Sequence, residues 1–156
     1  MFNFLNKKEK IEVFAPVEGF VIDITKVKDE VFSTKMLGDG FAIEPTGNTV
    51  VAPCDGKITL LADTKHAIAL ETGGVEMLIH IGLDTVELNG EGFTSFIEGG
   101  EVVKKGDKLI SFDKEVIKSK NKALTTMLVI TNMDDAVESM EKKLEYGEAI
   151  LTITAK

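Results

Sequence analysis

The sequence contains little cysteine and no long apolar run. Cys54 is its single cysteine, so no disulfide can form within the chain, which fits a reducing cytoplasm. Cys54 is also a poor candidate nucleophile, because the neighbouring carboxylate of Asp55 disfavours a thiolate. No apolar stretch approaches the roughly 18 residues that a membrane-spanning helix needs. Residues 1–11 lack the features of a signal peptide. We expect them to be a flexible lead-in to one domain over residues 12–156 in the cytoplasm.

Basic residues are outnumbered by acidic ones. The 156 residues include 18 basic and 26 acidic side chains, a formal net charge of −8. This balance argues against a nucleic-acid partner, which requires basic patches, and favours attraction toward basic proteins. The 44% hydrophobic content is enough to form one core in a chain of this length.

Short strand-like runs recur along the chain, separated by turn residues that include many of its 14 glycines. This pattern predicts an all-β fold, an antiparallel β-sandwich or barrel of the barrel-sandwich hybrid type, with one or two short peripheral helices. Residues 134–146 give the stronger helix prediction, because acids begin the segment, lysines occupy its last turns and Gly147 follows. A shorter helical turn is expected over residues 114–120. The strand-like runs are 12–15, 19–24, 40–44, 48–52, 56–61, 66–71, 75–82, 108–112, 126–131 and 148–153.

The chain has only two histidines, and they flank a predicted hairpin. The strand-like runs 66–71 and 75–82 are separated by three residues that include two glycines, which indicates a tight turn. With the loop centred on Gly73, His66 and His80 become direct cross-strand neighbours with Cβ atoms roughly 5 Å apart. A bulge that shifts the register by one residue would leave them in reach as diagonal neighbours. Two such imidazoles predict a nucleophile with a charge-steadying partner, or half of a zinc site.

The stretch from Gly74 to Phe93, GVEMLIHIGLDTVELNGEGF, resembles the glucose-family IIA component of the phosphoenolpyruvate-dependent sugar phosphotransferase system. The resemblance extends over essentially all of the chain from about residue 12, and the long stretch around His80 is highly specific. The chain is similar to the free-standing, single-domain form of this component. Supporting stretches are 15–19, 38–40, 45–48, 51–56, 64–67 and 131–134.

The resemblance implies a phosphotransferase component that carries a phosphoryl group on histidine. His80 would accept the group on Nε2 from the phosphocarrier protein HPr and pass it to the sugar-specific IIB component of a membrane-associated IIB/IIC permease. His66 would donate a hydrogen bond to the phosphoryl oxygens, and Thr64 would support His66. The carbonyl of Gly82 would fix the tautomer of His80 and leave Nε2 free.

The resemblance also implies a docking face around these histidines. Asp29 and Asp84 match acidic residues at its rim, placed to meet an arginine of HPr. Regulatory protein partners are a further implication of the family. The apolar ring around the site would consist of Val31, Phe32, Met36, Leu37, Leu78 and Val86.

Two other functions remain open on the residues alone. A biotinyl- or lipoyl-type carrier would need a lysine at a hairpin tip, and Thr34–Leu37 holds only a fragment of that pattern. A regulatory interaction protein without phosphoryl transfer is the other. No cofactor is required for the leading function. His66 and His80 could bind zinc weakly, with a partner's carboxylate completing the site at an interface, because stable zinc sites need three or four protein ligands.

Overall fold

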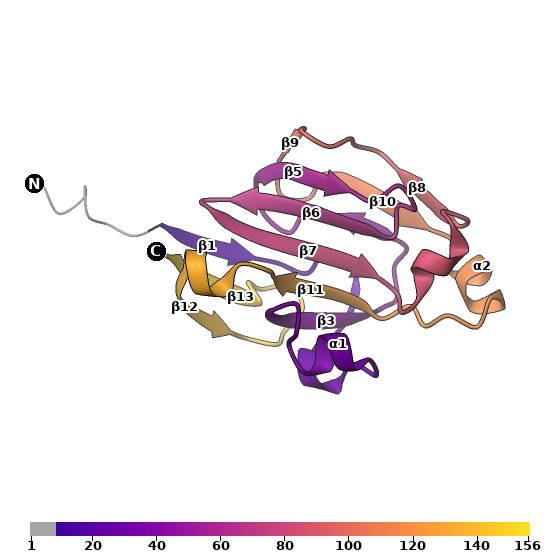
Figure 1. Ribbon diagram of the computed structural model, residues 1–156, viewed down its shortest axis with the longest axis horizontal. Helices are drawn as coiled ribbons and strands as arrows, with labels where there is room; N and C mark the ends of the chain where they lie inside the picture. The colour runs from indigo at the N-terminus through magenta and orange to yellow at the C-terminus, as the bar shows by residue number, and fades with distance from the viewer. Residues whose placement is uncertain (1–8) are drawn as a thin grey trace, which may run out of the picture.

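The computed structural model describes residues 9–156, and in it the strands form three antiparallel sheets (Figure 1). The predicted all-β sandwich is therefore confirmed. The largest sheet has the order β2 (Gly19–Asp23), β3 (Asp39–Pro45), β11 (Thr126–Ile130), β7 (Val75–Ile81), β6 (Ala67–Thr72), β5 (Gly56–Leu61) and β9 (Val102–Val103). The other two sheets are β4 (Thr49–Val51), β10 (Lys108–Phe112) and β8 (Phe93–Ser95), and β1 (Lys10–Val13), β13 (Leu151–Ala155) and β12 (Val137–Lys142).

Short helices connect strands of the sheets. The shorter predicted helix is present as α2, where the Asp113 carboxylate accepts hydrogen bonds from the backbone N–H groups of Glu115 and Val116 and so caps the first turn. Within residues 9–156 no helix is long and apolar enough to cross a membrane. The helices are α1 (Glu30–Ser33), α2 (Lys114–Ser119) and α3 (Met133–Ala136), with 3₁₀ turns η2 (Ile24–Lys26) and η3 (Thr85–Leu88).

Strand β7 lies in the middle of the seven-stranded sheet, with one face against the main core. Alternate residues along a strand point to opposite faces, and Met77, Ile79 and Ile81 are fully buried in the main core between the sheets. Leu78 and His80 therefore project from the other face. This alternation presents the imidazole of His80 on the outer side of the sheet.

The segment from η2 to α1 covers part of that outer face (Figure 1). Its residue Phe32 is buried in a small second cluster with Met127 of β11 and Ala42 of β3, and Leu78 packs against this cluster. In the strand register, Ala42 lies opposite Met127 and Met127 lies opposite His80. His80 therefore emerges at the border of an apolar patch, next to the helix that covers it.

The hairpin that carries the histidines has a register one residue away from the prediction. Thr72 pairs with Val75, so the turn consists of Gly73 and Gly74 alone, and both have positive φ values of 56° and 83°. Two-residue hairpins favour this conformation because its twist matches that of the strands. As a result, Ala67 and not His66 lies directly opposite His80.

The long helix predicted over residues 134–146 is wrong. Helix α3 ends at Ala136 and the chain continues as strand β12, paired with β13. Val137 and Met140 are three residues apart, as on one face of a helix, but their partners Ala155 and Ile153 are two residues apart. One extra residue in β12, a β-bulge, accounts for this spacing, and strand pairing overrides the local helix signal.

The domain includes residues that precede the predicted boundary at residue 12. Strand β1 starts at Lys10 and pairs with β13, with Lys10 opposite Thr154. The side chain of Ile11 is buried in the main core, so residues 10 and 11 belong to the domain and not to a flexible lead-in. The remainder of the predicted lead-in, residues 1–8, lies outside the described residues.

Candidate functional site

The two histidines meet at the surface of the outer face. Their ring centroids are 4.9 Å apart and the rings are nearly perpendicular, with an interplanar angle of 83°. The ring of Phe32 also lies close to His80, with the centroids 5.1 Å apart. His66 is buried and His80 is half-buried. The His80 imidazole thus contacts two rings while part of it remains open to solvent.

His66 reaches His80 from a loop and not from a strand. In a continuous strand, His66 would point to the face opposite that of Ala67 and His80, because side chains alternate. Strand β6 begins only at Ala67, and the preceding Lys65 has a positive φ of 58°. The backbone N–H of Ile81 still donates to the carbonyl of His66 at 2.8 Å. The loop is therefore fixed to β7 while it turns the His66 ring toward His80.

A single hydrogen bond defines the tautomer of His80. Its Nδ1 lies 2.8 Å from the carbonyl oxygen of Gly82, and a carbonyl oxygen can only accept, so Nδ1 carries the proton. In the neutral ring Nε2 then holds a free electron pair, as a nucleophile requires. Gly82 has a φ of 77°, and a Cβ at this position would lie 2.5 Å from Cγ2 of Thr85. Only glycine fits here.

Thr64 contacts the second histidine. Its Oγ1 lies 2.6 Å from Nδ1 of His66. When the hydroxyl donates in this bond, the neutral His66 ring carries its proton on Nε2 and can donate it to an oxygen near His80. Thr64 and Gly82 are therefore each bonded to the Nδ1 atom of one histidine. In this arrangement the hydroxyl of Thr64 donates in its bond, whereas the carbonyl of Gly82 accepts.

Burial sets the charge state of both imidazoles. It lowers the pKa of His66 below the ordinary value of 6.5, and the nearby His80 lowers it further. Burial also lowers the pKa of His80, although the hydrogen bond to Gly82 and the charges of Asp29 and Asp84 oppose that effect. Both rings are consequently neutral near pH 7.

The two predicted acidic rim residues lie near His80, each at the start of a short helical segment. Asp29 caps α1 by accepting a hydrogen bond from the N–H of Val31, and Asp84 directly precedes η3. Both carboxylates are close enough to raise the pKa of His80. Around them Val31, Met36, Leu37 and Val86 are exposed, between 39% and 73% of each residue.

The other two predicted ring residues lie beneath this surface. Phe32 is only 4% exposed and Leu78 is half-buried, and both belong to the apolar cluster under α1. Phe32 therefore belongs to the buried layer under the predicted docking face and not to its exposed surface. Its ring supports the imidazole of His80 from the side.

Three residues around Gly82 were missed by the sequence reasoning. The Thr85 hydroxyl donates to the carbonyl of Ile81, and the carbonyls of Thr125 and Ala123 accept from the backbone N–H groups of Gly82 and Leu83. Thr85 falls within the stretch 74–93 that carries the family resemblance, so it could have been singled out. No local pattern marks residues 123–125, which reach the site only through the pairing of β11 with β7.

Other candidate sites do not assemble a reactive group. Burial and the neighbouring Asp55 raise the pKa of Cys54 to about 12, so its thiol is unreactive. Lys35 directly follows the Thr34 cap of α1, with its ammonium 3.6 Å from Asp39, and does not occupy the hairpin tip that a biotinyl or lipoyl carrier requires. Among residues 9–156, no group of three or more metal-ligating side chains could hold a metal ion.

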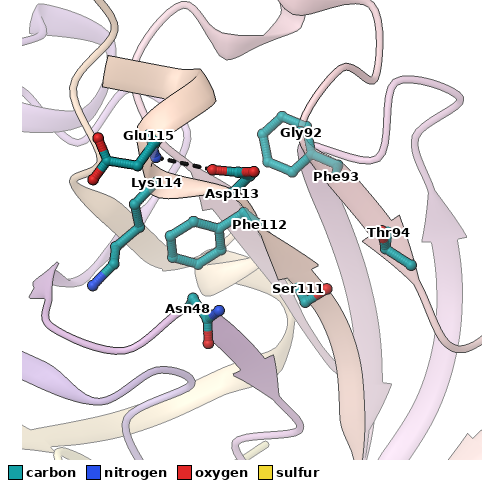
Figure 2. Close-up of a pocket in the computed structure, with 9 residues that line it drawn as sticks. All are labelled: Asn48, Gly92, Phe93, Thr94, Ser111, Phe112, Asp113, Lys114 and Glu115. Atoms are coloured by element: carbon teal, nitrogen blue, oxygen red, sulfur yellow. Dashed lines mark hydrogen bonds between the residues drawn. The ribbon is translucent and has the colours of Figure 1, made fainter. Parts of the chain in front are cut away.

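A separate hollow of about 570 Å³ lies at the start of α2 (Figure 2). Its lining includes Phe93, Phe112 and the capping carboxylate of Asp113, but neither histidine. The ammonium of Lys114 is bonded to the carbonyl of Thr46. This hollow therefore contributes nothing to the histidine chemistry.

The fold and the paired histidines define a phosphoryl-transfer protein, and comparison with known proteins identifies its family. The profile described as phosphoenolpyruvate-dependent sugar phosphotransferase system, EIIA 1, matches residues 11–136. The chain therefore belongs to this EIIA family. Proteins of the family are phosphotransferase components that accept a phosphoryl group from HPr and pass it to IIB, and this is the function of the chain.

The relatives are similar over nearly their whole length. The glucose-specific EIIA component of Haemophilus influenzae is 43% identical, over 97% of this chain and 93% of its own length. The Bacillus cereus glucose-specific EIIA component is 48% identical, over 90% and 86%. The solved structure of glucose permease IIA from Mycoplasma capricolum is 39% identical, with a TM-score of 0.82 over 94% of this chain and 95% of that one. The glucose-specific EIIBCA component of Corynebacterium glutamicum is 46% identical over 92% of this chain, which spans 21% of that longer protein.

Proposed function

We propose that His80 is the residue on which this EIIA component carries the phosphoryl group, between phospho-HPr and a glucose-specific IIB component. The observation that carries the proposal is the hydrogen bond from Nδ1 of His80 to the carbonyl of Gly82. It leaves Nε2 of this half-buried ring unprotonated. The relatives' names, which specify glucose, support glucose as the sugar.

The reaction follows from this arrangement. The Nε2 electron pair of His80 attacks phosphorus, and the bond between phosphorus and the donor group on HPr breaks as the new N–P bond forms. Nδ1 keeps its proton and its bond to Gly82, so the ring does not need to turn. An Nε2–H group on His66 donates to a phosphoryl oxygen and stabilises the charge there. Phosphoryl transfer depends mainly on such positioning, and two imidazoles are sufficient.

The surface around His80 supports transient docking of protein partners. The carboxylates of Asp29 and Asp84 would attract basic side chains of HPr, and exposed Val31, Met36 and Val86 add apolar contact area. We place the protein in the cytoplasm, where its membrane-bound IIB/IIC partner would present IIB. Regulatory partners would use the same face, because a phosphoryl group on His80 changes the charge at its centre.

Reconstitution with phosphoenolpyruvate, enzyme I and HPr tests the proposal directly. Intact-mass analysis of the wild-type chain should record one added phosphoryl group, labile in acid, and peptide mapping should locate it on His80. His80→Ala should gain none, while the matched variant His66→Gln should still gain one. Stable labelling of His80→Ala at another residue would overturn the assignment.

A further inference from the structure

The peptide groups on both sides of Gly82 have every polar atom bonded. On the first, the Ile81 carbonyl accepts from the Thr85 hydroxyl and the Gly82 N–H donates to the carbonyl of Thr125 at 2.9 Å. On the second, the Gly82 carbonyl accepts from Nδ1–H of His80, and the N–H of Leu83 donates to the carbonyl of Ala123 at 3.2 Å. The acceptor that orients His80 is thus part of a closed network.

Among residues 9–156, Thr85 is the only residue besides His80 that contributes a side chain to this network. It is fully buried at the first position of η3, and its hydroxyl has the Ile81 carbonyl as its partner. Its methyl group fills the space beside Gly82, where an added Cβ would come within 2.5 Å of it. Thr85 therefore restrains the Gly82 turn through both a hydrogen bond and packing.

Restraint matters here because glycine is the most permissive residue for backbone rotation. If the Ile81 carbonyl lost its partner, a buried acceptor would be unsatisfied, and rotation of the peptide toward another donor would relieve that cost. The same rotation would move the Gly82 carbonyl away from His80. A neutral histidine side chain in water favours the proton on Nε2, the tautomer that cannot attack phosphorus through Nε2.

We propose that Thr85 is a positioning residue for the phosphoryl acceptor: it fixes the Gly82 carbonyl against Nδ1–H of His80 and thereby keeps Nε2 unprotonated. The inference rests on the proposed function of His80. Thr85 does not touch the transferred group. Its effect is exerted through the backbone of Ile81 and Gly82.

Two variants separate the hydroxyl from the shape of the side chain. Thr85→Val keeps the branched shape and removes the donor, whereas Thr85→Ser keeps the donor and removes the methyl group. Nitrogen-15 NMR of the imidazoles in the unphosphorylated protein reports which nitrogen of His80 carries the proton. In parallel, rapid-quench kinetics measure the rate of transfer from phospho-HPr, and the amide spectrum checks that each variant is folded.

For Thr85→Val we expect a shift of His80 toward the Nε2–H tautomer and a transfer rate that falls about tenfold, the value of one positioned hydrogen bond. Thr85→Ser should restore the wild-type tautomer and rate. If Thr85→Val does not fold, Thr85→Ala removes the donor together with the methyl group and should give the same shift, with Thr85→Ser, which lacks only the methyl group, as its control.

Two results would overturn the inference. One is a folded variant without the hydroxyl that keeps the wild-type tautomer of His80. The other is a changed tautomer with an unchanged transfer rate, which would detach the network from the reaction. Both are distinct from failure of the proposed function, because that failure is detected by labelling of His80→Ala and not by the tautomer measurement.

Discussion

His66 and His80 are not cross-strand partners, and yet their rings lie edge to face with centroids 4.9 Å apart. The contact depends on the loop before β6, where Lys65 adopts a left-handed conformation and Thr64 bonds to the His66 ring. The two histidines are therefore held by different means. His80 is fixed within the sheet, and His66 is fixed by a loop that is hydrogen-bonded to strand β7 of that sheet.

The His66→Gln variant should divide the two halves of the reaction. Glutamine keeps an N–H donor, so phosphorylation of His80 by phospho-HPr should continue. Onward transfer to IIB should fall by on the order of 10²–10³, the typical value of one charge-stabilising contact, because glutamine cannot adjust its proton during transfer. Single-turnover transfer from the purified phosphorylated variant measures this step. Onward transfer at the wild-type rate would contradict this division of roles.

The acidic rim should act on the rate of association with HPr. Asp29→Lys and Asp84→Lys should slow transfer from phospho-HPr, most strongly at low salt, since exposed charges are screened over about 10 Å at 0.1 M ionic strength. Glu12→Lys makes the same charge change on the exposed face of β1 and serves as the control. An equal effect of all three variants would exclude a specific role for the rim.

Folding must be checked for one of these variants. Asp29 caps α1, and loss of such a cap costs about 0.5–2 kcal/mol of stability. Thermal unfolding should therefore show a modest loss for Asp29→Lys. Asp84 makes no capping hydrogen bond, so Asp84→Lys should not share that loss.

The pH dependence of phosphoryl acceptance should follow the protonation of His80. A proton on Nε2 removes the nucleophile, and burial lowers the pKa of His80, so acceptance should persist to a more acidic pH than a free histidine of pKa 6.5 would allow. Asp29→Asn and Asp84→Asn remove charges that raise this pKa. Each should move the acid limb of the rate profile, and the NMR titration of His80, to lower pH. A shift to higher pH would contradict the assigned electrostatics.

The same lowered pKa values predict a loss of stability in acid. Both histidines have pKa values below 6.5 in the folded chain, so the unfolded chain binds protons first. The stability present above pH 6.5 should decline as the pH falls from that value through the folded pKa values, and then level off with respect to these groups. Denaturant titrations of wild type and His66→Gln between pH 5 and 8 measure the decline. The variant should show the shallower slope, and equal slopes would contradict the prediction.

Zinc binding should be weak in the isolated protein. His66 and His80 supply two ligands, and no third ligand joins them in residues 9–156, whereas stable sites use three or four protein ligands. Calorimetry should give weak binding to the unphosphorylated chain and weaker binding after phosphorylation, which occupies Nε2 of His80. His66→Gln provides the control for the site. Tight binding by the wild-type chain alone would reveal a ligand that this arrangement does not include.

Much of the fold follows from local patterns, but pairing between distant segments does not. The short apolar run over residues 75–82 correctly predicts strand β7, whereas the spacing of Val137 and Met140 fits a helix or a bulged strand equally well. Only the partner strand β13 decides between them. The hairpin register likewise depends on whether two or three residues form the turn, and both readings place a glycine in it.

Part of the candidate site can likewise be predicted from local sequence and part cannot. The residue types and their closeness in sequence are enough to predict the group His66, His80, Thr64 and Gly82. The support of His80 by Phe32 and of Gly82 by residues 123–125 arises from contacts across the sheet, which local sequence does not encode. For this reason the sequence does not predict that the ring of Phe32 is buried.

The pairing of β1 with β13 has a consequence for how such a domain can be built into longer polypeptides. Lys10 lies opposite Thr154, so the chain enters and leaves the domain side by side, at the edge of the molecule away from the end of β7 that carries His80 (Figure 1). A linker attached at either end would leave the surface around His80 uncovered. The Corynebacterium glutamicum EIIBCA protein contains a region similar to this chain within a much longer polypeptide. This geometry allows one module to operate either as a diffusing shuttle or as a tethered neighbour of its acceptor.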